Sequence, residues 1–147
     1  MLQLIDKQIT YEDMALLVKW RKANELSYKE QPEITMSSMV EWLENHVFNK
    51  NRLLFWVIIN GKKIGHMGLF HFEKDSCELD GVLRGEPDYP GAIGKDLDTL
   101  ISMALKLKPK LYLRILTTNF HAYNFYLLHK FIPMGKEDVY IKMKYES

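Results

Sequence analysis

The stretch Cys77–Leu105, CELDGVLRGEPDYPGAIGKDLDTLISMAL, decides how the rest of the chain is interpreted. Its first part, up to Arg84, has the composition of a β-strand, and a loop rich in proline and glycine follows. The loop leads into an amphipathic helix whose apolar residues recur at helical spacing. The first N–H groups of a helix have no partner inside it and lie at the positive end of its dipole. The stretch therefore predicts an anion site, suited to phosphates, where this helix begins.

The residues before this stretch predict an edge strand and two helices. Leu2–Ile5 is a short apolar run, and Thr10, followed by acidic residues, is typical of a helix start. The polar, proline-containing segment Tyr28–Thr35 separates that helix from the next as a loop. Ser38 with Glu41 three residues later predicts a capping box that opens the second helix.

Three strands are predicted next. The continuous apolar run Leu53–Ile59 is typical of a central strand buried on both faces. Asn60 and Gly61 form the strongest short signal for a two-residue hairpin. The hairpin leads into Lys63–Phe72, and Cys77–Arg84 then completes an antiparallel meander.

The elements after the central helix complete the fold. Leu111–Thr117 is the next strand, and a strand–helix–strand crossover predicts a parallel pair. Asn119 opens another helix, and two closing strands lie near Phe131–Met134 and Val139–Tyr145. We therefore expect one α/β (α+β) domain over residues 1–147, with a mixed central sheet of about seven strands and helices on both faces.

Composition narrows the class of protein. A net charge of +1 over 147 residues gives no electrostatic case for nucleic acid or a membrane surface as partner. Cys77 is the single cysteine, so an internal disulfide and a cysteine-based metal site are excluded, and we expect no metal. No apolar run approaches the roughly 18 residues of a membrane helix, and the first residues lack a signal-peptide pattern. We therefore expect a cytosolic (cytoplasmic) protein.

Three stretches resemble the GCN5-related N-acetyltransferases (GNAT superfamily), and with the element order the resemblance covers nearly the whole chain. Leu17–Glu25 is similar to the first helix of the ribosomal-protein alanine acetyltransferase-like branch. Glu78–Leu97 resembles the acyl-CoA strand and pyrophosphate loop of the family. Thr118–Phe131 is the most specific match, because the family pattern N-x-x-A-x-x-F/L-Y-x-x-x-G-F coincides at Asn119, Ala122, Phe125, Tyr126 and Phe131.

The sequence departs from the family at three positions. Pro87 stands where the family loop has Gln or Arg, and Pro90 stands at its first glycine. Because proline has no backbone N–H, one phosphate donor would be missing. Lys130 replaces the usual glycine before Phe131, which alters a turn rather than the chemistry.

The resemblance implies an acyltransferase that uses acetyl-CoA and no metal. The implied cofactor-binding residues come from the strand, the helix start and the last helix; they are Val82, Leu83, Arg84, Gly91, Ala92, Ile93, Gly94, Lys95, Asn119 and Tyr126. The residues alone add that Gly81 permits a bulge or a close backbone approach in the strand.

Two catalytic residues are predicted for transfer to an amine. Tyr126 is the candidate general acid, since a phenol within reach can protonate a leaving thiolate. Glu78 resembles the strand glutamate that serves as base in several family members, and Asp80 shares its face. His66 and His71 have odd spacing, which predicts opposite faces, and either could act as base through water.

The acceptor side remains open between alternatives. Trp20, Arg21, Tyr28 and Asp80 are the candidate substrate contacts, by position in the family fold. The segment ELDGVLRGE loosely resembles acetyltransferases that act on amino groups of nucleotide-linked sugars, which favours a small amine, with an aminosugar nucleotide as the first guess. Edge strands at the C-terminus allow either a monomer or a homodimer. The runner-up acceptors are a protein N-terminus and a side-chain amine. A reading of another class is a degenerate GNAT domain that binds acyl-CoA or a protein partner without catalysis.

Overall fold

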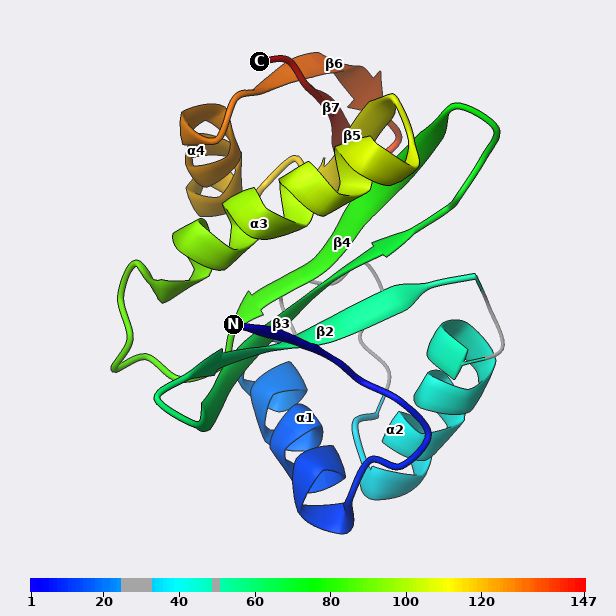
Figure 1. Cartoon of the computed structure of the whole chain (residues 1–147), viewed down its shortest axis with the longest axis vertical. Helices are drawn as coiled ribbons and strands as arrows, with labels where there is room; N and C mark the ends of the chain where they lie inside the picture. Colours follow the sequence, from blue (N-terminus) through cyan, green and yellow to red (C-terminus); the bar gives the residue numbers. More distant parts are fainter. Residues whose placement is uncertain (25–32, 49–50) are drawn as a thin grey trace.

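One mixed sheet with helices on both faces forms the structure (Figure 1). This computed structural model describes residues 1–24, 33–48 and 51–147, which contain seven strands, four α-helices and one π-helical segment. In chain order these are β1 (Leu2–Leu4), α1 (Tyr11–Ala23), α2 (Met36–Trp42), the π-helical η2 (Leu43–Phe48), β2 (Leu53–Ile59), β3 (Lys62–Phe70), β4 (Ser76–Arg84), α3 (Ala92–Leu107), β5 (Lys110–Leu116), α4 (Phe120–Leu128), β6 (Phe131–Glu137) and β7 (Tyr140–Tyr145). The predicted order of elements is confirmed.

The sheet order is β1-β2-β3-β4-β5-β7-β6. The first four strands pair antiparallel, and so do β5, β7 and β6. Only the junction of β4 with β5 is parallel within the described strands, because α3 carries the chain across the sheet between them. The predicted crossover is therefore confirmed, and it joins two antiparallel halves.

The two faces of the sheet are covered unequally. Helices α3 and α4 pack on one face over the main core, while α1 and α2 pack on the other face (Figure 1). In β2, Val57 faces the main core and Trp56 the smaller one, which confirms that this strand is buried on both faces. In β5, buried and half-buried residues alternate along the strand. One face of β5 is therefore packed by helices, and the other stays accessible to solvent.

Helix α2 begins three residues before the predicted start. Thr35 is its N-cap: the Thr35 hydroxyl accepts from the Ser38 N–H at 3.1 Å. The Ser38 hydroxyl in turn accepts from the Thr35 N–H at 2.8 Å. The predicted box of Ser38 with Glu41 is therefore wrong, because a serine hydroxyl takes the role that a glutamate plays in the usual capping box.

Two turns use the left-handed region of backbone space. Asn60 and Gly61 have φ of 52° and 78°, as a type I′ hairpin requires, so that prediction is confirmed. Lys130 has φ of 71°, at the position where the resembling family carries glycine. A side chain in this region costs about 1–2 kcal/mol, so the lysine strains the turn before β6 without altering its course.

Candidate active site

The central feature of the site is the separation of β4 from β5. These strands pair from Ser76 and Lys110 up to Leu79 and Leu113. Beyond that point β4 remains paired only with β3, and β5 only with β7, within the described strands. The facing edges therefore offer backbone N–H and C=O groups to whatever lies between them.

A β-bulge in β4 accompanies the separation. His66 pairs with Leu83 and Gly68 with Asp80, so Gly81 and Val82 together lie opposite Met67. Gly81 has φ of +63°, a conformation that glycine adopts without steric cost. Of the two features that Gly81 permits in the sequence, a bulge or a close backbone approach, the structure has the bulge, and it bends β4 near the point where its pairing with β5 ends.

A pocket of about 610 Å³ opens at this separation. Its walls come from β4, the start of α3, β5 and α4. Eight of the predicted cofactor-binding residues line it: Val82, Leu83, Arg84, Gly91, Ile93, Gly94, Asn119 and Tyr126. Ala92 and Lys95 belong to the same first turn of α3 but lie outside the lining.

The start of α3 forms one end of the pocket. Gly91 is the N-cap, with φ of 78°, and Pro90 precedes it. A Cβ added to Gly94 would meet only the His129 ring, at 3.4 Å, so the backbone is accessible here. The unpaired N–H groups of this first turn and the helix dipole make it suited to a phosphate group.

Tyr126 lies on α4, which Asn119 caps by accepting from the Ala122 N–H at 3.1 Å. The Tyr126 ring is 7% exposed, and it packs edge-on against Phe131 at 5.7 Å. Burial raises the pKa of Tyr126, and the charge of Asp80 raises it further. The phenol therefore keeps its proton at neutral pH and can donate it into the pocket.

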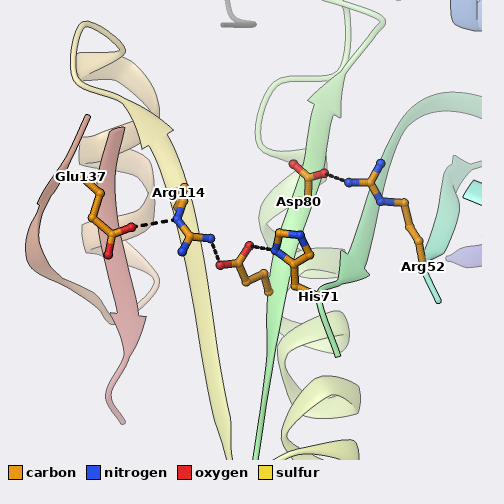
Figure 2. A network of polar contacts seen from close by, with 6 residues as sticks. Arg52, His71, Asp80, Arg114 and Glu137 are labelled. Carbon is orange, nitrogen blue, oxygen red and sulfur yellow. Dashed lines mark hydrogen bonds and ion pairs between the residues drawn. The ribbon is translucent and has the colours of Figure 1, made fainter. Parts of the chain in front are cut away.

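Asp80 brings a carboxylate to the pocket. Its Oδ2 accepts from the Arg52 guanidinium at 2.7 Å (Figure 2). Arg52 also stacks on Phe70, 4.3 Å from the ring centroid. Asp80 is 45% exposed, and within the described residues no other side chain binds it. Its second oxygen can therefore accept from a ligand.

Glu78 is not among the residues that line the pocket. Its Oε1 binds Arg114 and its Oε2 lies 3.0 Å from His71 Nδ1, while Arg114 Nε donates to Glu137 at 3.1 Å (Figure 2). Arg114, by contrast, lines the pocket. The role of Glu78 as general base stays a prediction, and in this structure its two oxygens contact Arg114 and His71.

The prediction that His66 and His71 face opposite sides is also wrong. His71 has φ of 49° and follows the last residue of β3, so the strand alternation no longer applies to it. Its ring turns back to stack on Phe70 at 4.1 Å and to contact Glu78. His66, inside β3, lies beside Trp20 on the same face.

The remaining predicted substrate contacts have different surroundings. Trp20 is 0% exposed and packs in the smaller core against Trp56, so its assignment to a substrate is corrected to a core role. Arg21 lies over the Trp42 ring at 4.9 Å. Tyr28 lies outside the described residues.

The described parts of the chain contain neither a group of metal-binding side chains nor a membrane-spanning helix. Residues 1–24, 33–48 and 51–147 contain no cluster of three His, Cys, Asp or Glu side chains that could hold a metal ion. In the same ranges no helix combines the length and apolarity that crossing a membrane requires.

Solved structures of other proteins share this fold. No protein-family model and no curated protein matches the sequence. The N-acetyltransferase PseH of Campylobacter jejuni, solved in complex with acetyl coenzyme A, matches 100% of this chain and 99% of its own, with a TM-score of 0.77 and 17% identity. FdhC, described as a nucleotide-linked sugar GNAT, matches 98% of this chain and 84% of its own, with a TM-score of 0.78 and 16% identity. This chain has the GNAT fold.

The GNAT fold is also found in an enzyme that is named for a different acceptor, spermidine. A variant of the spermidine N-acetyltransferase SpeG from Vibrio cholerae matches 99% of this chain and 94% of its own, with a TM-score of 0.75 and 16% identity. The fold prediction is therefore confirmed. A nucleotide-linked sugar GNAT and a spermidine N-acetyltransferase share it, so the likeness leaves the acceptor open.

Sequence reasoning missed several residues of this GNAT-fold pocket. Arg114, His121 and Tyr140 line it, and Arg52 holds Asp80. One signal for Arg114 is present: Leu111, Leu113 and Ile115 alternate as buried residues, which places the arginine between them on the open face. The partners of Arg114 come from other strands, and no local pattern indicates them.

Proposed function

We propose that this protein transfers an acetyl group from acetyl-CoA to a primary amine of a small acceptor. One observation carries the proposal: β4 separates from β5 at the Gly81 bulge, and the pocket so formed reaches from the start of α3 to Tyr126. The pocket combines three features that acyl transfer from acyl-CoA requires. A helix start can bind the phosphates, an extended slot can bind the arm that carries the thioester, and a protonated phenol can protonate the leaving thiolate. The N-acetyltransferases that share the fold support the assignment.

The residues fit acetyl-CoA by their chemistry. The α3 start, with Gly91, Ile93 and Gly94 in the lining, would hold the pyrophosphate. The free edge of β4 at Val82 and Leu83 would bind the amide-containing arm by backbone hydrogen bonds and polarise the acyl carbonyl. The thioester supplies an activated acyl carbon and a thiolate leaving group.

The proposed reaction is direct transfer. The amine nitrogen forms a bond to the acyl carbon while the carbon–sulfur bond breaks, and Tyr126 gives its phenolic proton to the sulfur. An acceptor that arrives as an ammonium ion first gives one proton to water, which frees the nitrogen lone pair. After the attack, water at the open pocket takes the second proton from the nitrogen and returns one to the phenolate. No base from the chain is required in this scheme, which agrees with the engagement of Glu78 by Arg114 and His71.

The charges beside the pocket favour an acceptor with one amine. Glu78, Asp80 and Glu137 each pair with an arginine. A polyamine carries several positive charges, and these paired acids would compensate them poorly. Asp80, with one oxygen available, can anchor a single ammonium group, so we retain an aminosugar nucleotide or a similar small amine as first choice. The expected cytosolic location and the assembly state, monomer or homodimer, stay predictions.

Binding and turnover test the proposal in sequence. Acetyl-CoA at about 100 times its Kd should raise the Tm by roughly 5–10 °C. Thiol release from acetyl-CoA should then be measured with an aminosugar nucleotide, a free amino sugar, spermidine and a peptide with a free N-terminus. We expect release with one of the small amines. Release only with the peptide would favour a protein N-terminal or side-chain acetyltransferase instead.

Pro90 supports a second candidate, a domain that binds acyl-CoA without catalysis. It lacks a backbone N–H next to the phosphate-binding turn, which would weaken that end of the site. This candidate predicts a Tm increase with acetyl-CoA and no thiol release with any acceptor. The absence of a Tm increase would reject both candidates.

Asp80→Asn tests the acceptor anchor. The variant should raise KM for the amine about tenfold and leave KM for acetyl-CoA within twofold, because the amide removes the negative charge without changing shape. Steady-state kinetics with each substrate varied in turn measures both constants. Glu137→Gln is the matched control, since it removes a carboxylate that also pairs with an arginine but lies outside the pocket lining. Equal effects of the two variants would contradict the anchoring role.

A further inference from the structure

A buried histidine on β3 contacts the β4 bulge from the side away from β5. His66, on β3, is 8% exposed, and its Nδ1 lies 2.5 Å from the carbonyl oxygen of Gly81. A carbonyl oxygen only accepts, so the imidazole carries its proton on Nδ1 and donates it. The sequence drew attention to His66 only as one of two candidate bases.

His66 takes no part in the chemistry proposed above. It lies outside the pocket lining and beside the Trp20 ring, at a centroid distance of 6.2 Å. Burial and, to a lesser extent, the charge of Arg21 lower the pKa of His66 to about 4, against the opposing effect of the Gly81 hydrogen bond. The ring is therefore neutral at physiological pH and acts as a fixed donor rather than a proton carrier.

The bulge leaves the Gly81 carbonyl without a hydrogen-bond donor from the regular ladder of the sheet. In a bulge the extra residue leaves the regular ladder, and Gly81 has the left-handed conformation. A carbonyl that leaves the ladder inside the protein needs another donor. His66 is that donor, and it comes from the neighbouring strand on the side away from β5.

We propose that His66 is a positioning residue: its hydrogen bond to the Gly81 carbonyl holds the β4 bulge and so keeps the slot between β4 and β5 open for acetyl-CoA. This inference rests on the proposed function for its ligand, but its geometric part concerns the bulge alone. Without the donor, Gly81 and Val82 lose one defined conformation, and the facing edge of β4 no longer presents a fixed set of backbone groups.

Two variants of nearly equal shape separate the hydrogen bond from packing. In His66→Asn, the amide nitrogen can take the place of Nδ1 and donate to Gly81, while His66→Leu is isosteric with asparagine and cannot donate. We expect His66→Leu to raise KM for acetyl-CoA at least tenfold, with kcat changed less than threefold. His66→Asn should remain within threefold of the original protein for both constants. Equal values of KM in the two variants would overturn the proposal.

Two measurements decide the geometric part without acetyl-CoA. Hydrogen exchange of the 79–84 backbone amides should be at least tenfold faster in His66→Leu than in His66→Asn. The imidazole ¹⁵N spectrum of the unaltered protein should show His66 protonated on Nδ1. A proton on Nε2, or equal exchange in the two variants, would reject the role of His66. Failure of the unaltered protein to bind acetyl-CoA would instead reject the proposed function.

Discussion

Replacing Tyr126 with phenylalanine is expected to lower kcat by about 100-fold or more and to leave KM for acetyl-CoA within threefold. Burial raises the pKa of Tyr126, and the charge of Asp80 raises it further, so the phenol that lines the pocket is protonated at neutral pH. Phenylalanine retains the packing against Phe131 and loses only the proton donor. A leaving thiolate would then depend on water for its proton. Steady-state kinetics of thiol release measures the effect.

Tyr123→Phe is the matched control for this prediction. Tyr123 lies on the same helix, is partly buried against the main core and does not line the pocket. The same loss of a hydroxyl there should leave kcat within twofold. A Tyr126→Phe variant with unaltered turnover would show that another group, or water alone, protonates the thiolate.

Gly94→Glu is expected to weaken acetyl-CoA binding about 30-fold or more. The substitution adds a negative charge to the first turn of α3, where the proposed pyrophosphate would bind, and the space around a new Cβ contains only the His129 ring. Two like charges about 4 Å apart near a protein surface repel by a few kcal/mol, and solvent reduces this to about 2 kcal/mol. Isothermal titration with acetyl-CoA gives the Kd directly.

Thr99→Glu controls for charge elsewhere on α3. Thr99 is exposed and lies more than one turn further along the helix, outside the pocket lining. It should change the Kd less than threefold. If both variants weaken binding equally, the phosphate group does not lie at the start of α3.

The sequence predicted those features that depend on local patterns. The Asn60–Gly61 hairpin, the Thr10 helix start and the Gly81 bulge each follow from residues within a few positions of each other. The prediction of a capping box between Ser38 and Glu41 was wrong because the hydroxyls of Thr35 and Ser38 accept from the N–H groups at the helix start. The actual N-cap, Thr35, lies three residues before the predicted one.

The contacts of the site that the sequence did not reveal are made between residues far apart in the chain. Glu78 was proposed as a base through its resemblance to the strand glutamate of family members, and nothing in the sequence indicated that Arg114, 36 residues later, binds its carboxylate. Trp20 was assigned to the substrate, but the smaller core encloses it completely. These contacts depend on how strands and helices meet in space, and no spacing within the sequence encodes them.

Pro90 also has a simpler place in the structure than the family pattern suggested. It precedes Gly91, the N-cap, and so lies outside the first turn of α3. The N–H groups of Ile93, Gly94 and Lys95 belong to that turn and do not depend on residue 90. The missing donor therefore removes a flanking contact and leaves the helix start itself intact.

The one-sided helix cover of β5 bears on how such a protein could change over evolutionary time. Half-buried residues of β5 and β7 that line the pocket, such as Leu116 and Tyr140, can vary without opening a cavity in the main core. Acceptor choice can therefore drift through substitutions that cost little folding free energy, while the opposite face, which supports the acetyl-CoA slot, stays under the constraint of close packing. The unequal cover gives the fold a region that tolerates mutation beside one that does not, and descendants could acquire new acceptors while retaining the same donor.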